Sequence, residues 1–197
     1  MASIPERILT ERLLLRCWEP EDAPALRTAI DASLAQLREW LPWAVGEPSP
    51  VEELAERLRR FGETFRAGED WPLGVFDRTT GSLLGGAGLH RRTGPGALEI
   101  GYWLRVEAGG RGYASEAVEA LTAAALQHGG VDHVEIRCDP RNVRSIAVAR
   151  RAGFRHVRTL VGDALTPSGA PSETMVWARS EPGRHLADPV GPAAAGG

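Results

Sequence analysis

The sequence predicts an α+β (α/β) protein built on one mixed sheet of seven strands that is flanked by about four helices. Three observations support this prediction: short segments in which apolar and polar residues alternate, two apolar stripes at helical spacing, and a strand, glycine-rich turn and helix in succession over residues 97–128. The chain has 197 residues and 43% hydrophobic content, which suffices for one domain with a full core. We expect that domain over residues 1–179 and a flexible tail, rich in Pro, Gly and Ala, over residues 180–197.

The first third of the chain predicts one strand and two helices. Residues 11–18 carry enough aliphatic side chains for a strand, and an acidic turn suited to a helix start follows. Two apolar stripes at helical spacing come next, separated by a proline-rich hinge: Leu26, Ile30, Leu34, Leu37 and Leu41, then Val51, Leu54, Leu58, Phe61 and Phe65. The first helix is expected to end at Pro42.

The remaining residues predict six strands and two helices. A hairpin is expected over residues 71–77 and 82–90, followed by a fourth strand over residues 97–105 and a helix to about residue 128. A right-handed crossover places the fifth strand, residues 133–138, parallel to the fourth. Asn142 is a suitable N-cap for a helix over residues 143–152, and residues 154–161 and 173–178 supply the last two strands.

The glycine-rich turn after the fourth strand predicts an anion site. Gly109, Gly110 and Gly112 can adopt backbone angles closed to other residues and leave no side chain in the way. Several amide N–H groups can therefore converge at the positive end of the following helix, where a phosphate or pyrophosphate would bind. The turn lacks the Lys-Ser/Thr pair of a P-loop and does not match the dinucleotide spacing G-x-G-x-x-G.

Composition excludes several function classes. A net charge of -3 and a pI near 6.0 argue against binding to nucleic acid through phosphate neutralisation. All 23 basic residues are Arg, so Schiff-base chemistry on a Lys is excluded. Two distant cysteines and five histidines without ligand spacing favour neither a disulfide scaffold nor a metal site. With no signal pattern and no membrane-spanning run, we expect a cytoplasmic protein, monomeric or homodimeric, without a membrane partner.

Three motifs in order carry a resemblance to a known family: EIGYWL, GGRGYASEA, and DPRN-x-x-S-x-A-x-x-x-x-x-GF. Together they resemble the GCN5-related N-acetyltransferases (GNAT), and within them the RimJ/RimL-like branch that acetylates protein N-terminal amines. The resemblance covers roughly residues 11–179. The family's pyrophosphate motif falls on residues 109–114, where Gly109 replaces the usual Gln or Arg.

The resemblance implies the GNAT fold, with the fourth and fifth strands splayed to hold acetyl-CoA. The main chain of Leu104 and Val106 would contact the pantetheine, and Asn142 would hold the same arm. The residues that the resemblance assigns to acetyl-CoA are Leu104, Val106, Gly109, Gly110, Arg111, Gly112, Tyr113, Ala114, Ser115, Asn142 and Ser145.

The resemblance also implies the groups that carry the chemistry. Many family members place a proton-donating Tyr where this chain has Ala149, so the role passes to Ser145, whose alternative is to hydrogen-bond the helix N-terminus. For the base, Glu99 comes first and Asp163 second, with water alone as the third possibility. Glu99 has the alternative of pairing with an Arg or facing solvent.

Acceptor binding is assigned to Trp40, Trp43, Glu99 and Trp103, the first two forming a wall of the acceptor groove or simply packing a helix end. The expected reaction is direct ternary-complex transfer of acetyl to a primary amine, a protein or peptide N-terminal α-amine first of all. The alternatives are a small-molecule amine, such as an antibiotic, polyamine or aminoacyl nucleotide, and a non-catalytic acyl-CoA-binding module. A covalent route through Cys138 lacks a partner histidine in its motif.

Overall fold

The computed structural model describes residues 4–166 and 169–181, so most of the predicted tail lies outside the described residues. The helices and strands follow one another in the order β1 (Arg7–Leu9), β2 (Leu13–Cys17), η1 (Pro20–Asp22), α1 (Ala23–Trp40), η2 (Pro42–Gly46), α2 (Val51–Ala67), β3 (Asp70–Asp77), β4 (Leu83–His90), β5 (Ala97–Leu104), η3 (Val106–Ala108), α3 (Tyr113–His128), β6 (His133–Cys138), α4 (Val143–Arg151), β7 (Arg155–Leu165) and β8 (Pro171–Ser180). Each predicted helix and strand is present. None of the described helices has the length and hydropathy needed to cross a bilayer.

The strands form one mixed sheet in the order β1-β2-β3-β4-β5-β6-β8-β7. Among the described strands, β5 and β6 alone pair in parallel, and the other neighbouring pairs are antiparallel. Within the described residues the sheet has eight strands rather than the predicted seven, because the short edge strand β1 pairs with β2. Its three residues are too few for an alternating pattern to stand out in the sequence.

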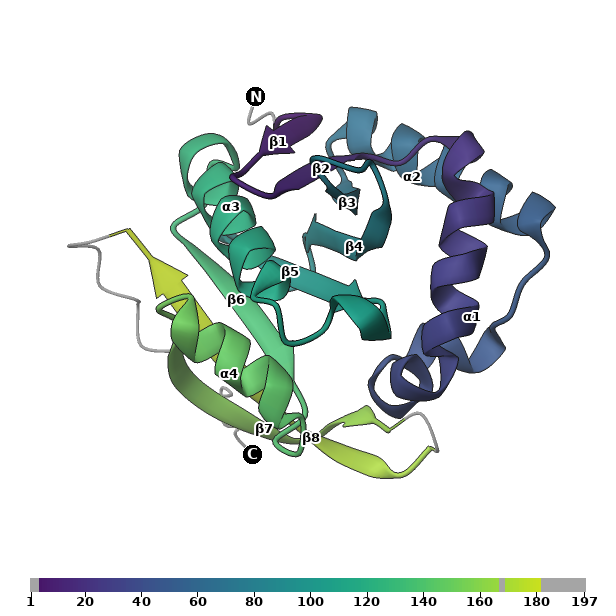
Figure 1. Cartoon of the computed structure of the whole chain (residues 1–197). Helices are drawn as coiled ribbons and strands as arrows, with labels where there is room; N and C mark the ends of the chain where they lie inside the picture. The colour runs from purple at the N-terminus through teal and green to yellow at the C-terminus, as the bar shows by residue number, and fades with distance from the viewer. Residues whose placement is uncertain (1–3, 167–168, 182–197) are drawn as a thin grey trace.

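Helices cover both faces of this sheet (Figure 1). On one face, β2, β3 and β5 direct Leu15, Val75 and Ile100 into a core shared with Val118 and Leu121 of α3. The opposite face of β2–β4 packs with α1 and α2 in a second core, which contains Trp18, Leu26, Ile30, Leu54, Leu58 and Phe76. The apolar stripes of both helices therefore face inward, as the spacing predicts.

The parallel strands β5 and β6 pair over a short distance and then separate. Their register joins Ala97 with His133, Leu98 with Val134, and Glu99 with Glu135, and it ends there. Beyond this point β5 continues along β4 to Leu104, whereas β6 continues along β8 to Cys138. The splay expected between the fourth and fifth strands of the sequence analysis is confirmed, since these strands are β5 and β6. It leaves a gap in the middle of the sheet.

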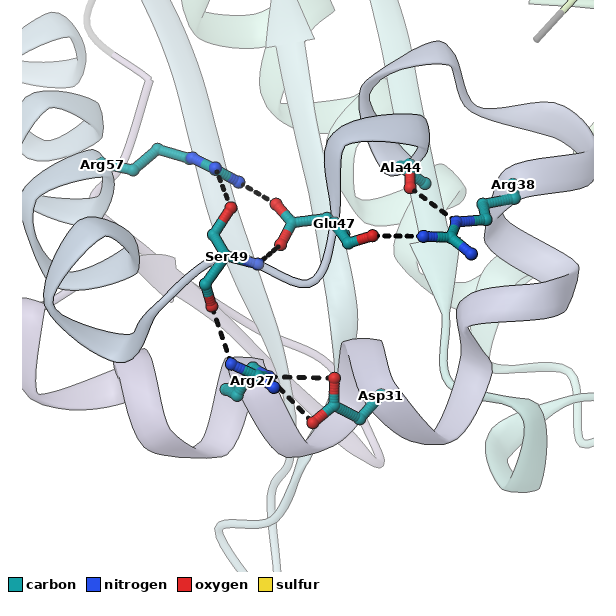
Figure 2. A network of polar contacts seen from close by, with 7 residues as sticks. All are labelled: Arg27, Asp31, Arg38, Ala44, Glu47, Ser49 and Arg57. Atoms are coloured by element: carbon teal, nitrogen blue, oxygen red, sulfur yellow. Dashed lines mark hydrogen bonds and ion pairs between the residues drawn. The ribbon is translucent and has the colours of Figure 1, made fainter. Parts of the chain in front are cut away.

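A buried carboxylate fixes the loop between α1 and α2 (Figure 2). The Glu47 side chain is 1% exposed and accepts hydrogen bonds from Arg57 of α2 at 2.5 Å and from the Ser49 N–H at 2.6 Å. From α1, Arg38 donates to the Glu47 carbonyl and Arg27 donates to the Ser49 carbonyl at 2.9 Å. Both helices therefore hold this loop, and with it the short helix η2.

Replacing Glu47 with Gln should destabilise the protein by about 2 kcal/mol, because it removes the buried negative charge that pairs with Arg57. The loss is limited because the Arg57 side chain is partly solvated. Burial alone would raise the pKa of Glu47, but hydrogen bonds from Arg57 and Ser49 outweigh it and lower the pKa. This contribution is therefore present above the unfolded carboxyl pKa of about 4.3 and is lost as pH falls through the lower folded value.

Urea unfolding followed by tryptophan fluorescence would measure the change at pH 7 and pH 4. The matched control is Glu52→Gln, since Glu52 is exposed in the first turn of α2, and its effect should stay within about 0.5 kcal/mol. Equal stability of Glu47→Gln and the control would contradict the role given to this carboxylate.

Candidate functional site

A cavity of about 610 Å³ lies where β5 and β6 separate. Its lining takes Leu73 and Ile100 from one face of the sheet and Trp18 and Trp103 from the other. From β5 the lining continues across the opening to Arg137 and Cys138 at the end of β6. The lining also includes Asn142 at the N-terminus of α4.

Glycines keep the strands beneath this cavity bare. A Cβ at Gly86 of β4 would lie 2.7 Å from the indole nitrogen of Trp103, and one at Gly101 of β5 would lie 3.3 Å from Nε2 of His90. The rings of Trp103 and His90 therefore lie over positions that have no side chain. Larger residues at these glycines would push both rings into the cavity.

The three tryptophans assigned to the acceptor are brought together on one side of the cavity. Trp40 is the last residue of α1, and Pro42 starts the turn that carries Trp43. The Trp43 and Trp103 rings are tilted at 60° with their centroids 5.9 Å apart. Trp43 remains 41% exposed, so this aromatic wall borders the opening of the cavity.

Ser145 and Asn142 lie on the opposite side, at the start of α4. The Asn142 side chain accepts a hydrogen bond from the Ser145 N–H at 3.0 Å, which confirms Asn142 as the N-cap. This leaves the Ser145 hydroxyl free to act elsewhere, and it lies 2.8 Å from the hydroxyl of Tyr102 on β5. The two hydroxyls form a connected pair across the gap.

The thiol and phenol at this end of the cavity hold their protons. Burial raises the pKa of Tyr102 to about 12, although its hydrogen bond with Ser145 opposes the shift. Burial likewise raises the pKa of the Cys138 thiol. At neutral pH both groups can donate a proton, and Cys138 is a poor nucleophile because its thiolate is disfavoured.

Glu99 lies at the point where β5 and β6 part. Its side chain is 15% exposed and forms long ion pairs with Arg92 at 3.6 Å and with Arg137 at 4.0 Å. Arg137 also contacts Glu135 at 3.0 Å and so links the two carboxylates of the last parallel pair. Asp163, the second candidate base, is exposed on β7 and does not line this cavity.

The predicted anion cradle follows the C-terminal end of β5, beyond the cavity lining. Gly110 and Gly112 have φ values of 75° and 82°, and Gly112 is the N-cap of α3. The first N–H groups of an α-helix have no acceptor within the helix, so they point outward here. Ser115 Oγ is buried in the first turn and has no hydrogen-bond partner among the described residues. An anion with several oxygens fits this arrangement.

Arg12 and Glu116 hold the cradle against the N-terminal strands. Arg12 forms an ion pair with Glu116 at 2.6 Å and donates a hydrogen bond to the Arg111 carbonyl at 2.9 Å. Thr10 donates to the same carboxylate at 2.5 Å. The Arg111 side chain itself remains exposed.

Leu104 and Val106 differ in whether their main-chain N–H and C=O groups are available to a ligand. Arg105 donates its N–H to Leu84 of β4, so the alternation of an antiparallel ladder turns the main chain of Leu104 toward the gap. The Val106 N–H instead donates to Ser33 Oγ of α1 at 3.0 Å, and its carbonyl accepts from the Gly109 N–H at 3.0 Å. The geometry thus favours Leu104 over Val106 as a main-chain contact for a ligand.

Two groups at the cavity were not expected from the sequence. Tyr102 stands in an alternating strand, and nothing in the sequence indicates that it meets Ser145, 43 residues away. His90 is the last residue of the predicted hairpin; it ends β4, lines the cavity, and binds Asp70 through Nδ1 at 3.0 Å. A histidine at the end of a hairpin strand was the one available signal.

The fold, the gap between parallel strands and the glycine turn at a helix N-terminus define an acetyltransferase of a known class. The chain belongs to the GNAT family: the model described as Acetyltransferase (GNAT) domain matches residues 12–155. The expectation drawn from the three motifs is thereby confirmed at the level of the family and of its acyltransferase activity.

Similar proteins carry related names. The putative ribosomal N-acetyltransferase YdaF of Bacillus subtilis is 29% identical over 154 residues, 74% of this chain and 79% of YdaF. A putative ribosomal-protein-serine acetyltransferase from Vibrio cholerae is 26% identical, with a TM-score of 0.74 over 90% of this chain and 99% of that one. The ribosomal-protein acetyltransferase RimL, solved with coenzyme A, is 24% identical, with a TM-score of 0.78 over 90% and 97% of the two chains.

Proposed function

We propose that this protein transfers the acetyl group of acetyl-CoA directly to the N-terminal α-amine of a protein or peptide. The observation that carries the proposal is the gap between β5 and β6, which opens into a cavity with hydroxyl donors on one side and an aromatic wall on the other. An acyl donor entering through the gap and an amine entering along the wall would meet there.

Acetyl-CoA fits the donor side of this arrangement. The main-chain amides after Gly110 and the unpartnered Ser115 hydroxyl would hold the pyrophosphate, and β5 leads from this cradle back to the cavity. Coenzyme A in the RimL structure supports the assignment, because RimL shares this fold.

An α-amine suits the acceptor side. An N-terminal amine has an ordinary pKa of about 7.7 to 8.0, against about 10.4 for a lysine or a similar alkyl amine, so a useful neutral fraction exists at neutral pH. The carboxylate of Glu99 would attract the ammonium form, and the wall of Trp40, Trp43 and Trp103 would border the residues that follow it. Names given to YdaF and to the Vibrio cholerae protein point to ribosomal proteins as acceptors.

The leaving thiolate needs a proton, and the Ser145–Tyr102 pair can supply it. Tyr102 is protonated at neutral pH, since its pKa is raised to about 12. Ser145 would donate to the sulfur as the C–S bond breaks, Tyr102 would replenish that proton through the 2.8 Å hydrogen bond, and water would return a proton to Tyr102. The transfer needs no acetylated cysteine.

The proposal is tested by offering acetyl-CoA with two sets of acceptors and measuring the release of CoA thiol. One set contains peptides that begin with Ser, Ala or Met, each with its N-acetylated copy as the control. The other set contains polyamines, aminoglycosides and aminoacyl nucleotides. Turnover on free peptides but not on their blocked copies is expected. Faster turnover on a small amine would show that the acceptor is a small molecule and not a peptide. Binding of acetyl-CoA without turnover on any amine would show that the protein is a non-catalytic acyl-CoA-binding module.

Ser145→Ala should lower kcat by about 10- to 100-fold and leave the Kd of acetyl-CoA nearly unchanged, because the hydroxyl acts on the leaving group. Steady-state kinetics and calorimetry check the two quantities, with Ser82→Ala as a control at an exposed turn. Tyr102→Phe should lower kcat in the same direction, and the double variant should cost less than the product of the two effects. Equal losses in kcat and in affinity would make Ser145 a cofactor-positioning residue.

Gly112→Ala should weaken the binding of CoA by about tenfold, since an L-residue at φ of 82° costs about 1 to 2 kcal/mol. The free loop can relax away from this angle, and binding must restore it. Titration calorimetry measures the change, with Gly46→Ala as the control because a Cβ there meets no atom within 4 Å. An unchanged Kd of CoA in a folded Gly112→Ala protein would show that the glycine turn does not bind CoA.

A further inference from the structure

Four titratable side chains form a row across the sheet at the point where it opens. Asp70 of β3 is the cross-strand partner of His90, His90 is the partner of Glu99, and Glu99 is the partner of Glu135. Directly opposite residues in a sheet share one face. His90 and Glu99 both line the cavity, so the row brings an imidazole and a carboxylate to the acceptor side.

Asp70 fixes the orientation of the His90 ring. One carboxylate oxygen of Asp70 lies 3.0 Å from His90 Nδ1, and the other accepts the Arg91 N–H at 2.9 Å. A carboxylate can only accept this hydrogen bond, so in the neutral form of the imidazole Nδ1 carries the proton and Nε2 has a lone pair. The same arrangement of carboxylate and imidazole orients a general base in hydrolases.

The free nitrogen lies over the bare strands of the cavity. A Cβ at Gly101 would lie 3.3 Å from Nε2, and a Cβ at Gly88 would lie 3.0 Å from the same atom. The imidazole is thus seated above two glycines of β4 and β5, with 20% of its side chain exposed. An acceptor amine, or a water beside it, can reach Nε2 from the cavity.

We propose that His90 accepts the proton of the acceptor ammonium and that Asp70 positions it; this rests on the proposed function above. The N–H bond of R-NH3+ breaks and its proton binds Nε2, giving R-NH2 and an imidazolium. The neutral amine then forms the C–N bond with the acetyl carbonyl, and the C–S bond breaks as Ser145 gives a proton to the thiolate. The new amide nitrogen releases its second proton to water, and water returns a proton to the Ser145–Tyr102 pair. The imidazolium returns its proton to solvent.

The charges around His90 divide the work between it and Glu99. Asp70 on β3 faces Nδ1, Arg91 and Arg92 follow β4, and Glu99 lies opposite on β5 with Arg137 of β6 beyond it. Glu99 is already in ion pairs with Arg92 and Arg137, which suits it to attract an ammonium. An imidazole is in general a better match than a carboxylate for an α-ammonium, because its ordinary pKa is closer to that of the amine.

The test compares the pH dependence of kcat/KM for a peptide acceptor in four variants: His90→Gln, Asp70→Asn, Glu99→Gln and the control His128→Gln. His128 is exposed at the end of α3, away from the cavity. His90→Gln should lower kcat/KM about 10- to 100-fold at pH 7 and move the acidic limb of the profile up towards the pKa of the acceptor amine, because the amide can still bind Asp70 but cannot take the proton. The deficit should shrink near pH 9, where the amine is already neutral. The Kd of acetyl-CoA should not change.

Gly101→Ala tests the same assignment without touching either residue. Its Cβ would press on Nε2 and on other side-chain atoms only, so a several-fold loss in kcat/KM with a folded protein is expected. Nitrogen-15 spectra of the imidazoles give a readout independent of turnover. The His90 signal, assigned by its loss in His90→Gln, should show the Nδ1–H form, and Asp70→Asn should change the balance between tautomers.

The outcomes separate this inference from the function on which it rests. An active wild type whose His90→Gln variant keeps its rate and its acidic limb overturns the role of His90 alone. A shift of that limb in Glu99→Gln but not in His90→Gln assigns the base to Glu99. A wild type that binds acetyl-CoA and acetylates no amine overturns the function itself. Thermal unfolding of each variant shows that a loss of activity is not a loss of fold.

Discussion

The separation of β5 and β6 after their third residue pair is the constraint on which the site depends. Each strand keeps a full antiparallel partner on its other side, β4 for β5 and β8 for β6, so the separation leaves neither strand unsupported. Arg137 lies between the carboxylates of Glu99 and Glu135 in the last pair, and it offsets the repulsion of two like charges placed opposite each other. The sheet is therefore held together at the fork and open beyond it.

What surrounds the opening is fixed from outside the sheet. Arginines of α1 and α2 bind the loop that follows η2. The short helix η2 contains Trp43, whose ring contacts that of Trp103. On the other side, the Asn142 cap sets the first turn of α4, and with it the position of Ser145. Different contacts thus position Trp43 and Ser145, and β5 carries one residue of each side, Trp103 for the wall and Tyr102 for the hydroxyl donors.

The sequence predicted the elements well because their patterns are local. Neighbouring residues alone determine the alternation over residues 97–105, the glycine turn and the Asn142 cap. The separation of the two parallel strands was predicted from the resemblance to the family. Register is not local: the row from Asp70 through His90 to Glu99 exists only because of how β3, β4 and β5 align. For the same reason Tyr102 could not be matched with Ser145, nor could Ser33 be expected to occupy the Val106 N–H.

The cavity separates two opposite proton tasks by burial and by charge. Around Ser145, burial keeps the Tyr102 phenol and the Cys138 thiol protonated, which suits the side where a thiolate must leave. Around Glu99, arginines and carboxylates lie close together, and Asp70 holds the His90 ring with one nitrogen free, which suits the side where an ammonium must lose its proton. Burial alone favours the neutral thiol and the neutral amine, but it supplies no group that can take the proton an ammonium releases. The gap between β5 and β6 therefore joins a buried end suited to giving a proton to a charged end suited to accepting one.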